Sequence, residues 1–168
     1  MWAAAALLGA CASPHQTDDA SPWTSGRLSV RIDASGAIAA RSVSSAFELR
    51  GSAERGELRL ISPLGTQMAA ARWAPGQAVL ATSEGEQSFA SLDELSRAAL
   101  GEALPLAALP DWLAGRPWAS AAHQVRDDGF DQLGWRVLLT RRTEGWIEAR
   151  RDAPPAVAVR VKLDAVEP

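Results

Sequence analysis

The sequence predicts a mainly β fold, in which one long antiparallel sheet is interrupted by two inserted helices. Apolar and polar residues alternate with a period of two in most segments between Leu28 and Leu163, as in strands with one buried side. Short turn sequences separate these segments, and such turns join antiparallel strands. Helical spacing appears only between residues 91 and 114. A sheet of this length tends to curl and remove its edges, and with a helical insert it can enclose an apolar cavity.

Strict alternation between apolar and polar positions predicts the first two strands. The buried face of the first strand is expected to carry Leu28, Val30 and Ile32. The buried face of the second strand is expected to carry Val43, Ser45, Phe47 and Leu49. The intervening positions hold Ser, Arg, Ala or Glu, so the opposite face is expected to be open to solvent.

A hairpin is predicted over residues 58–73, where two strand-like runs flank the sequence Ser62-Pro63-Leu64-Gly65. Pro63 presets the backbone angle of position i+1 in a type I turn, while Ser62 and Gly65 suit positions i and i+3. Leu64 is unusual, because position i+2 at a water-facing tip would accept Asn, Asp or Ser. Two alternatives remain open: Leu64 packs back onto the rim of the sheet or a neighbouring loop, or it points outward toward a membrane or a lipid.

Two further turns and two strands follow the hairpin. Pro75-Gly76 predicts the first turn, and the alternating residues 77–82 predict the strand after it. Ser83 to Gly85 predicts the second turn, which leads into a short strand that ends near Phe89. Beyond this point the spacing of apolar residues becomes helical, so the sheet is expected to be interrupted here.

Two short helices are predicted in this interruption. Ser91 is the expected N-cap of the first helix, because Glu94 follows three residues later in a near match to a capping box. Gly101 is the expected stop. The second helix is expected over residues 106–114. Pro110 lies inside it and lacks a backbone N–H, so we expect a kink or two helical pieces.

From Phe130 onward the period returns to two and predicts the last three strands. Their apolar positions are Trp135, Val137 and Leu139, then Trp146 and Ile147, then Val157, Val159, Val161 and Leu163. His123 precedes these strands, and we place it in a loop without assigning it a role. Asp127-Asp128 lies beside Gly129, where a solvated turn is the simpler account.

Composition and motifs exclude several classes of function. The net charge of −3 makes nucleic acid a poor candidate partner. No cluster of His, Cys or carboxylate residues has metal spacing, and neither a phosphate-binding loop nor a nucleophile elbow is present. We therefore expect neither an enzyme nor a metal or soluble cofactor. The chain has 7 Trp and no Tyr; most of these large apolar side chains are expected in the core, and a few could line a cavity.

The first residues predict a lipid anchor. A short apolar run ends in Leu8-Gly9-Ala10-Cys11, which has the form of a lipobox, the signal for diacylglycerol transfer to a cysteine sulfur and cleavage before it. Residues 1–10 are then a lipoprotein-type signal peptide, and Cys11 carries a diacylglycerol and an N-acyl group. No Lys or Arg precedes the run, so we expect the true start codon upstream of Met1. The alternative is an ordinary secretory signal with a chance cysteine.

The predicted organisation has two parts after the signal. Residues 11–25 are polar, contain two prolines and lack helical periodicity, so they are interpreted as a tether between the lipid and the domain. Residues 26–168 form the β domain. Ala12 follows the cysteine, where Asp in many Gram-negative lipoproteins retains the protein in the inner membrane, so by that resemblance export to the outer membrane is expected.

Five sequence pieces in a fixed order point to a known family. They are Gly26-Arg27-Leu28, Ser62-Pro63-Leu64-Gly65, Pro75-Gly76, PLAALPDWLAGRP at residues 105–117, and Gln132-Leu133-Gly134-Trp135. No single piece is specific, but all five in this order behind a lipobox are. The chain resembles the LolB family of outer-membrane lipoproteins over most of residues 26–164. Members of this family receive other lipoproteins and insert them into the outer membrane.

The resemblance implies an open, incomplete antiparallel β-barrel whose concave side is covered by helices. The apolar hollow between them would hold the acyl chains of a client lipoprotein, with Trp73, Leu106, Leu109, Trp112 and Trp135 as candidate cavity residues. The hairpin tip Pro63, Leu64 and Gly65 corresponds to the family's membrane-delivery loop.

The implied partners are the periplasmic carrier LolA, client lipoproteins and the inner leaflet of the outer membrane, where the protein would face the periplasm as a monomer. The chain departs from the family in two places. Only Pro22-Trp23-Thr24-Ser25 precedes Gly26, where family members usually have a helix, and the C-terminus lacks the expected tryptophan.

Another class of function remains open from the residues. The protein could be a lipid-anchored binder of another small apolar ligand, or a non-catalytic envelope assembly factor that uses the curved sheet only as a scaffold. Acceptance of a lipoprotein from a preformed complex with LolA distinguishes these alternatives from the LolB function.

Overall fold

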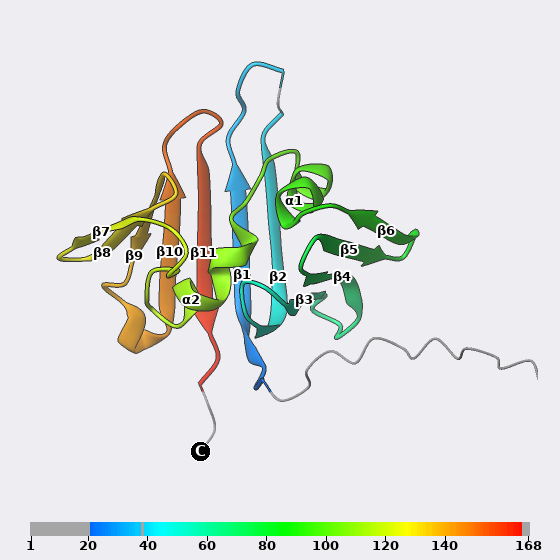
Figure 1. Ribbon diagram of the computed structural model, residues 1–168, viewed down its shortest axis with the longest axis horizontal. Coiled ribbons are helices and arrows are strands. Elements are labelled where there is room, and N and C mark those ends of the chain that lie inside the picture. The colour runs from blue at the N-terminus through cyan, green and yellow to red at the C-terminus, as the bar shows by residue number, and fades with distance from the viewer. Residues whose placement is uncertain (1–20, 38, 166–168) are drawn as a thin grey trace, which may run out of the picture.

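The computed structural model describes residues 21–37 and 39–165. These residues form one antiparallel sheet with a short helical insert (Figure 1). The predicted signal peptide, the lipidation site at Cys11 and most of the predicted tether lie outside the described residues. Those features therefore stay predictions.

Eleven strands in the described part of the chain pair in the order β6-β5-β4-β3-β2-β1-β11-β10-β9-β8-β7. Their bounds are β1 Thr24–Ile32, β2 Arg41–Gly51, β3 Gly56–Ile61, β4 Gln67–Ala74, β5 Gln77–Thr82, β6 Gly85–Phe89, β7 His123–Arg126, β8 Gly129–Gln132, β9 Trp135–Leu138, β10 Trp146–Arg151 and β11 Val157–Leu163. Every neighbouring pair is antiparallel. The outer strands β6 and β7 do not pair with each other, so the predicted open barrel is confirmed.

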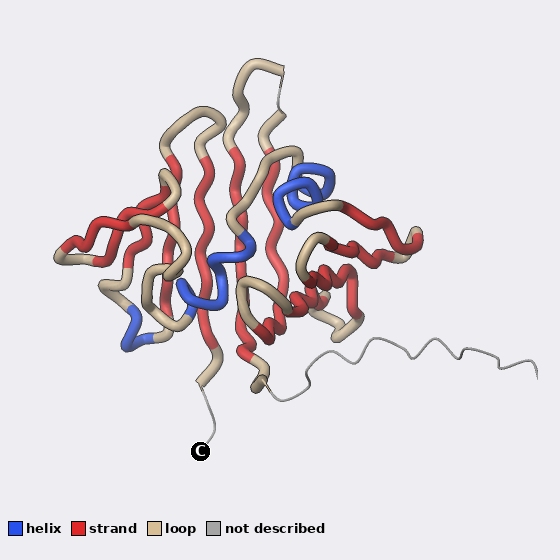
Figure 2. Tube along the Cα trace, viewed as in Figure 1, coloured by secondary structure: helices blue, strands red, loops and turns tan. Residues whose placement is uncertain are grey.

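The helical insert lies between β6 and β7 in the sequence and on one face of the sheet in space (Figure 2). It consists of α1 Leu92–Leu100, the 3-10 turn η1 Leu106–Ala108 and α2 Leu109–Leu113. A second 3-10 turn, η2 Arg142–Glu144, precedes β10. We call the face that the insert covers the inner face and the opposite one the outer face.

The predicted boundaries of the insert are confirmed. The Ser91 hydroxyl accepts a hydrogen bond of 3.2 Å from the Glu94 N–H, and a Glu94 carboxylate oxygen accepts one of 3.1 Å from the Ala90 N–H. Gly101 ends α1 with φ of 80°, a left-handed conformation that favours glycine. The second predicted helix is divided into η1 and α2, and Pro110 lies in the first turn of α2, where a missing N–H costs nothing.

Two local predictions need correction. His123 was placed in a loop, but it begins strand β7 and pairs with Gln132 of β8. The segment has one apolar residue, Val125, whose side chain is 77% exposed, so it carries no buried alternation that would identify a strand. Its β structure comes only from pairing with β8. In addition, β1 begins at Thr24, two residues before the predicted domain start.

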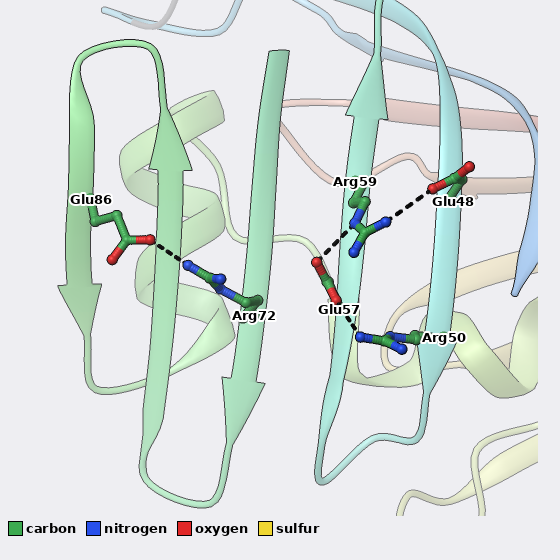
Figure 3. A network of polar contacts seen from close by, with 6 residues as sticks. All are labelled: Glu48, Arg50, Glu57, Arg59, Arg72 and Glu86. Carbon is green, nitrogen blue, oxygen red and sulfur yellow. Dashed lines mark hydrogen bonds and ion pairs between the residues drawn. The ribbon is translucent and has the colours of Figure 1, made fainter. Parts of the chain in front are cut away.

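Charged side chains pair with one another across the outer face of β2–β6 (Figure 3). Glu57 is at the centre of this network, because its two carboxylate oxygens lie 2.9 Å from Arg50 Nη2 and 2.9 Å from Arg59 Nε. Arg59 also lies 3.5 Å from Glu48. The pair Arg72–Glu86 reaches across the intervening strand β5. Since the Glu57 side chain is only 8% exposed, these contacts compensate for its lost hydration.

The Glu57 carboxyl has opposing influences on its pKa. Burial raises the pKa, whereas hydrogen bonds from Arg59 and Arg50 and the charges of both guanidinium groups lower it. The hydrogen bonds and charges of the two arginines together outweigh the effect of burial, so the pKa lies below its ordinary value of 4.5. A carboxyl whose pKa is lowered by folding stabilises the native state above the unfolded pKa, and that contribution is lost as pH falls through the folded pKa.

We therefore expect Glu57→Gln to lower the free energy of unfolding at pH 7 by about 1–2 kcal/mol, because two charge-assisted hydrogen bonds are lost. The difference from the parent should shrink as pH falls below 4.5 and the parent carboxyl becomes protonated. Denaturant unfolding between pH 7 and pH 3 measures both effects. Glu86→Gln is the matched control, because the Glu86 side chain is 61% exposed and its removal should change stability little. A Glu57→Gln penalty that stays constant over this pH range would contradict the assignment.

Candidate functional site

An apolar cavity of about 370 Å³ lies between the inner face of the sheet and the helical insert. Residues of strands β1–β5 and β9–β11 line it together with residues of α1, η1 and α2. Because strands from both halves of the sheet border one hollow, the sheet must curve around it. The volume lies within the range of about 300–1,000 Å³ that is usual for small-molecule sites.

The cavity presents almost nothing polar to an occupant. Among the described residues no charged side chain lines it, and the hydroxyls of Thr82 and Ser96 are its only hydroxyl groups. The Ser96 hydroxyl donates to the Asp93 carbonyl at 3.2 Å and accepts from the Leu104 N–H at 2.9 Å. The Thr82 hydroxyl accepts from the Glu84 N–H at 3.2 Å. Both hydroxyls are therefore engaged locally, and the cavity is suited to hydrocarbon and not to ions.

One buried amide ties helix α2 and the segment that follows it to strand β8. The Gln132 side chain, 2% exposed, accepts hydrogen bonds from Trp112 Nε1 at 2.8 Å and from the Trp118 N–H at 2.9 Å. It donates to the carbonyls of Trp118 at 2.7 Å and Ala121 at 2.8 Å. Arg142 Nη2 also donates to the Ala114 carbonyl at the end of α2, at 2.6 Å. Sequence reasoning assigned neither residue a role, because their partners are 11 to 28 positions away.

The structure brings four of the five candidate cavity residues together. Leu106, Leu109, Trp112 and Trp135 all line the hollow. The rings of Trp112 and Trp135 lie 6.2 Å apart between centroids. These two side chains are 2% and 4% exposed, so they form a rigid end of the cavity wall. Whether these residues contact acyl chains stays a prediction.

The structure corrects the placement of Trp73, which is not among the lining residues. Its position on β4 shares a face with Ala69 and Ala71, which do line the cavity, but it lies at the end of the strand. Its Nε1 donates to the Ser52 carbonyl at 2.9 Å, and its ring covers Gly56, where an added Cβ would come within 2.4 Å of it. Trp73 therefore packs beneath the β2–β3 turn and borders a different, more polar hollow instead of the apolar cavity.

The β3–β4 hairpin ends in a turn that stabilises itself. The Gly65 N–H donates to the Ser62 carbonyl at 2.9 Å, and the Ser62 N–H donates to the Thr66 carbonyl at 2.8 Å. The Ser62 hydroxyl accepts from the N–H groups of Leu64 and Thr66 at 3.3 and 3.2 Å. None of these bonds uses the Leu64 side chain, which is 92% exposed. Packing of Leu64 onto the rim of the sheet is thereby excluded, and the side chain points outward.

The described residues offer little support for other kinds of site. Across residues 21–37 and 39–165, no three His, Cys, Asp or Glu side chains gather closely enough to hold a metal ion. His123 is exposed on β7. In that part of the chain no helix has both the length and the apolar character needed to cross a membrane. A second, more open hollow of about 580 Å³ has Glu54, Asp93 and Arg151 in its lining.

Comparison with known proteins gives one consistent result. The sequence model of the family described as "Outer membrane lipoprotein LolB" matches residues 22–164. A Bordetella pertussis protein named "Outer-membrane lipoprotein LolB" is 40% identical over 92 residues, which cover 50% of this chain and 46% of that protein, so the match spans about half of the relative's length. Proteins of the same name from Bordetella petrii and Cupriavidus metallidurans are 33% and 30% identical. Those matches cover 83% and 94% of this chain, and 77% and 81% of the relatives.

Proposed function

The chain belongs to the outer-membrane lipoprotein LolB family, and from this premise we propose that it receives lipoproteins in its apolar cavity and inserts them into the outer membrane. The single observation that carries the proposal is the uncharged cavity of about 370 Å³ beneath the helical insert. The protein would face the periplasm from the inner leaflet of that membrane. None of the described residues that line the cavity is titratable, so we propose no catalytic role for it.

The cost of exposing acyl chains to water explains why such a cavity is needed. Burial of one methylene contributes about 0.8 kcal/mol, so an acyl chain of about a dozen methylenes costs roughly 10 kcal/mol to expose. A client with several chains would therefore pass directly from the apolar site of a carrier to this cavity. We propose the periplasmic protein LolA as that carrier. Transfer then requires the cavity to bind the chains better than the carrier does, and the bilayer to bind them better still.

We assign acceptance of the client's acyl chains and delivery of the client into the membrane to separate parts of the molecule. The cavity accepts the chains, and the exposed Leu64 at the tip of the β3–β4 hairpin enters the bilayer for delivery. Moving a leucine side chain from water into an apolar phase contributes about 1.5–3 kcal/mol. That contribution is too small to anchor a protein but large enough to change how often the tip enters a membrane.

A second candidate function is suggested by the same cavity. Its volume would also suit one small apolar molecule, so the protein could bind such a ligand without transferring lipoproteins. Transfer of a lipoprotein from its complex with LolA to the purified, unlipidated protein separates the two. Failure of this transfer, together with tight binding of a free apolar ligand, would favour the second function.

The lipid anchor is assigned to Cys11 on the basis of the lipobox Leu8 to Cys11. We expect the mature protein extracted from membranes to begin at Cys11 and to carry a diacylglycerol and an N-acyl group. Intact mass measurement before and after ester hydrolysis checks both statements. An unmodified thiol, or a different first residue, would contradict the prediction of a lipid anchor at Cys11. It would not bear on the proposed role of the cavity.

The cavity is tested by filling it. Val159 of β11 is half-buried and lines the hollow, so the larger side chain of Val159→Trp should extend into it. If about two methylenes of a bound chain are displaced, affinity for a fatty acyl ligand should fall roughly fifteenfold. Fluorescence titration with a labelled acyl ligand measures the change. Val79→Trp is the matched control, because Val79 is half-buried on the outer face; equal losses in the two variants would count against the cavity.

The hairpin tip is tested by Leu64→Glu. Because the turn does not use this side chain, we expect an unchanged melting temperature and normal acceptance of a client from LolA. Release into membranes should fail, since a charged tip opposes entry into the bilayer. Leu64→Met is the control and should release normally. Melting temperature, acceptance and insertion are measured on each variant; normal insertion by a folded Leu64→Glu protein would refute the delivery role.

A further inference from the structure

The outer face of the sheet is divided into two halves that differ in charge. On strands β2–β6 the charges balance, because the network in Figure 3 contains three cations and three anions, Arg50, Arg59, Arg72, Glu48, Glu57 and Glu86. The outward-facing positions of β1, β9, β10 and β11 are different. Among these described positions only one is anionic, Glu148, and six are cationic: Arg27, Arg31, Arg136, Arg150, Arg160 and Lys162. We call these six residues the basic strip.

The basic strip is incompletely neutralised by its neighbours. Glu148 is shared between Arg150 at 2.7 Å and Arg160 at 3.6 Å. Arg31 lies 3.0 Å from Asp33, and Arg136 lies 3.3 Å from Asp131, which also pairs with Arg126. In the described part of the chain, three carboxylates thus pair with four of the six cations of the strip. The chain as a whole has a net charge of −3, so the strip reflects segregation of charge and not a general basic excess. Such a surface attracts anions, because its field adds over several side chains.

Two cations of the strip oppose each other directly. Arg27 of β1 and Lys162 of β11 are cross-strand partners on the same face, and like charges in this arrangement are destabilising. Lys162 is held aside by a hydrogen bond to the Glu144 carbonyl and by the ring of Trp146, 5.6 Å from its Nζ. Arg27 makes no ion pair with any residue in the described ranges. An anion lying over this pair would relieve the repulsion.

The start of the domain also lies on the outer face. Trp23 stacks between the guanidinium groups of Arg50 and Arg59, whose Cζ atoms lie 4.5 and 4.3 Å from its ring centroid. Both arginines belong to the outer-face network. The Trp23 side chain therefore lies on the outer face, opposite the helical insert. Twelve residue steps separate Cys11 from Trp23, so the anchor that we proposed above would keep this end of β1 within about 40 Å of the membrane.

We propose that the basic strip is a docking surface for the anionic phospholipid headgroups of a bilayer. Arginine suits this role because its planar guanidinium group can donate two parallel hydrogen bonds to a phosphate. Lys162 of β11 and Arg27 of β1 are paired across neighbouring strands on the outer face. The same cross-strand row continues to Ala46 of β2 and then to Ile61 of β3, at the base of the β3–β4 hairpin. Docking of the strip thus places the outer face against the headgroups, while the helical insert faces away from them.

The proposal is tested with the full chain carrying Cys11→Ala, so that no lipid anchor contributes to binding. Cosedimentation compares vesicles of phosphatidylcholine and phosphatidylglycerol with vesicles of phosphatidylcholine alone. We expect binding to the anionic vesicles only, and we expect it to weaken as salt is raised. The double variant Arg27→Gln/Arg160→Gln should bind roughly 25-fold more weakly, at about fivefold for each basic residue near an anionic surface.

Two controls separate charge position from net charge and from folding. Arg97→Gln/Arg116→Gln removes the same charge from exposed sites on the helical insert, which faces away from the strip, and should bind like the parent. Arg27→Lys/Arg160→Lys keeps the charge and should retain most of the binding. Equal binding to neutral and anionic vesicles, an unaffected Arg27→Gln/Arg160→Gln protein, or equal losses in the two glutamine variants would overturn the proposal. The assay uses no carrier, client or acyl ligand, so a negative result leaves the cavity function standing.

Discussion

The pairing of β1 with both β2 and β11 is the interaction on which the rest of the structure depends. It joins the N-terminal strands β2–β6 to the C-terminal strands β7–β11, which have no other neighbour in common within the sheet. Only when the two halves are joined do Val30, Val43 and Val159 meet on one inner face. The apolar hollow is therefore a product of long-range pairing, and no single hairpin could form it.

An unfilled interior is unusual for a small β domain, and the helical insert accounts for it. It covers the inner face, so that the apolar lining meets helices and not bulk water. The buried amide of Gln132 makes one hydrogen bond to Trp112 of α2 and three to the segment after it, which leaves neither of its polar atoms unsatisfied. Directional hydrogen bonds thus fix the position of the helical insert, while the surface that faces the cavity is apolar and makes no directional contacts. This combination allows a flexible chain to occupy the cavity without specific recognition.

The two faces of the sheet carry different chemistry because side chains alternate along each strand. The inner face is apolar and bounds the cavity, whereas the outer face holds a balanced ion-pair network on β2–β6 and the basic strip on β1 and β9–β11. Acceptance of an apolar ligand and contact with charged headgroups can therefore be separated on opposite sides of one layer. Leu64, at the tip of the β3–β4 hairpin, provides an exposed apolar side chain outside the cavity.

Local chemistry in the sequence was enough to predict the mainly β class, the Ser62–Gly65 turn, the cap at Ser91 and the division of the second helix at Pro110, because each depends on residues a few positions apart. The family resemblance added the covered hollow. The sequence did not reveal β7, the fastening role of Gln132 or the position of Trp73, because each depends on partners distant in the chain. Trp73 shows the reason: alternation assigns a side chain to a face, but only tertiary packing decides which hollow that part of the face borders.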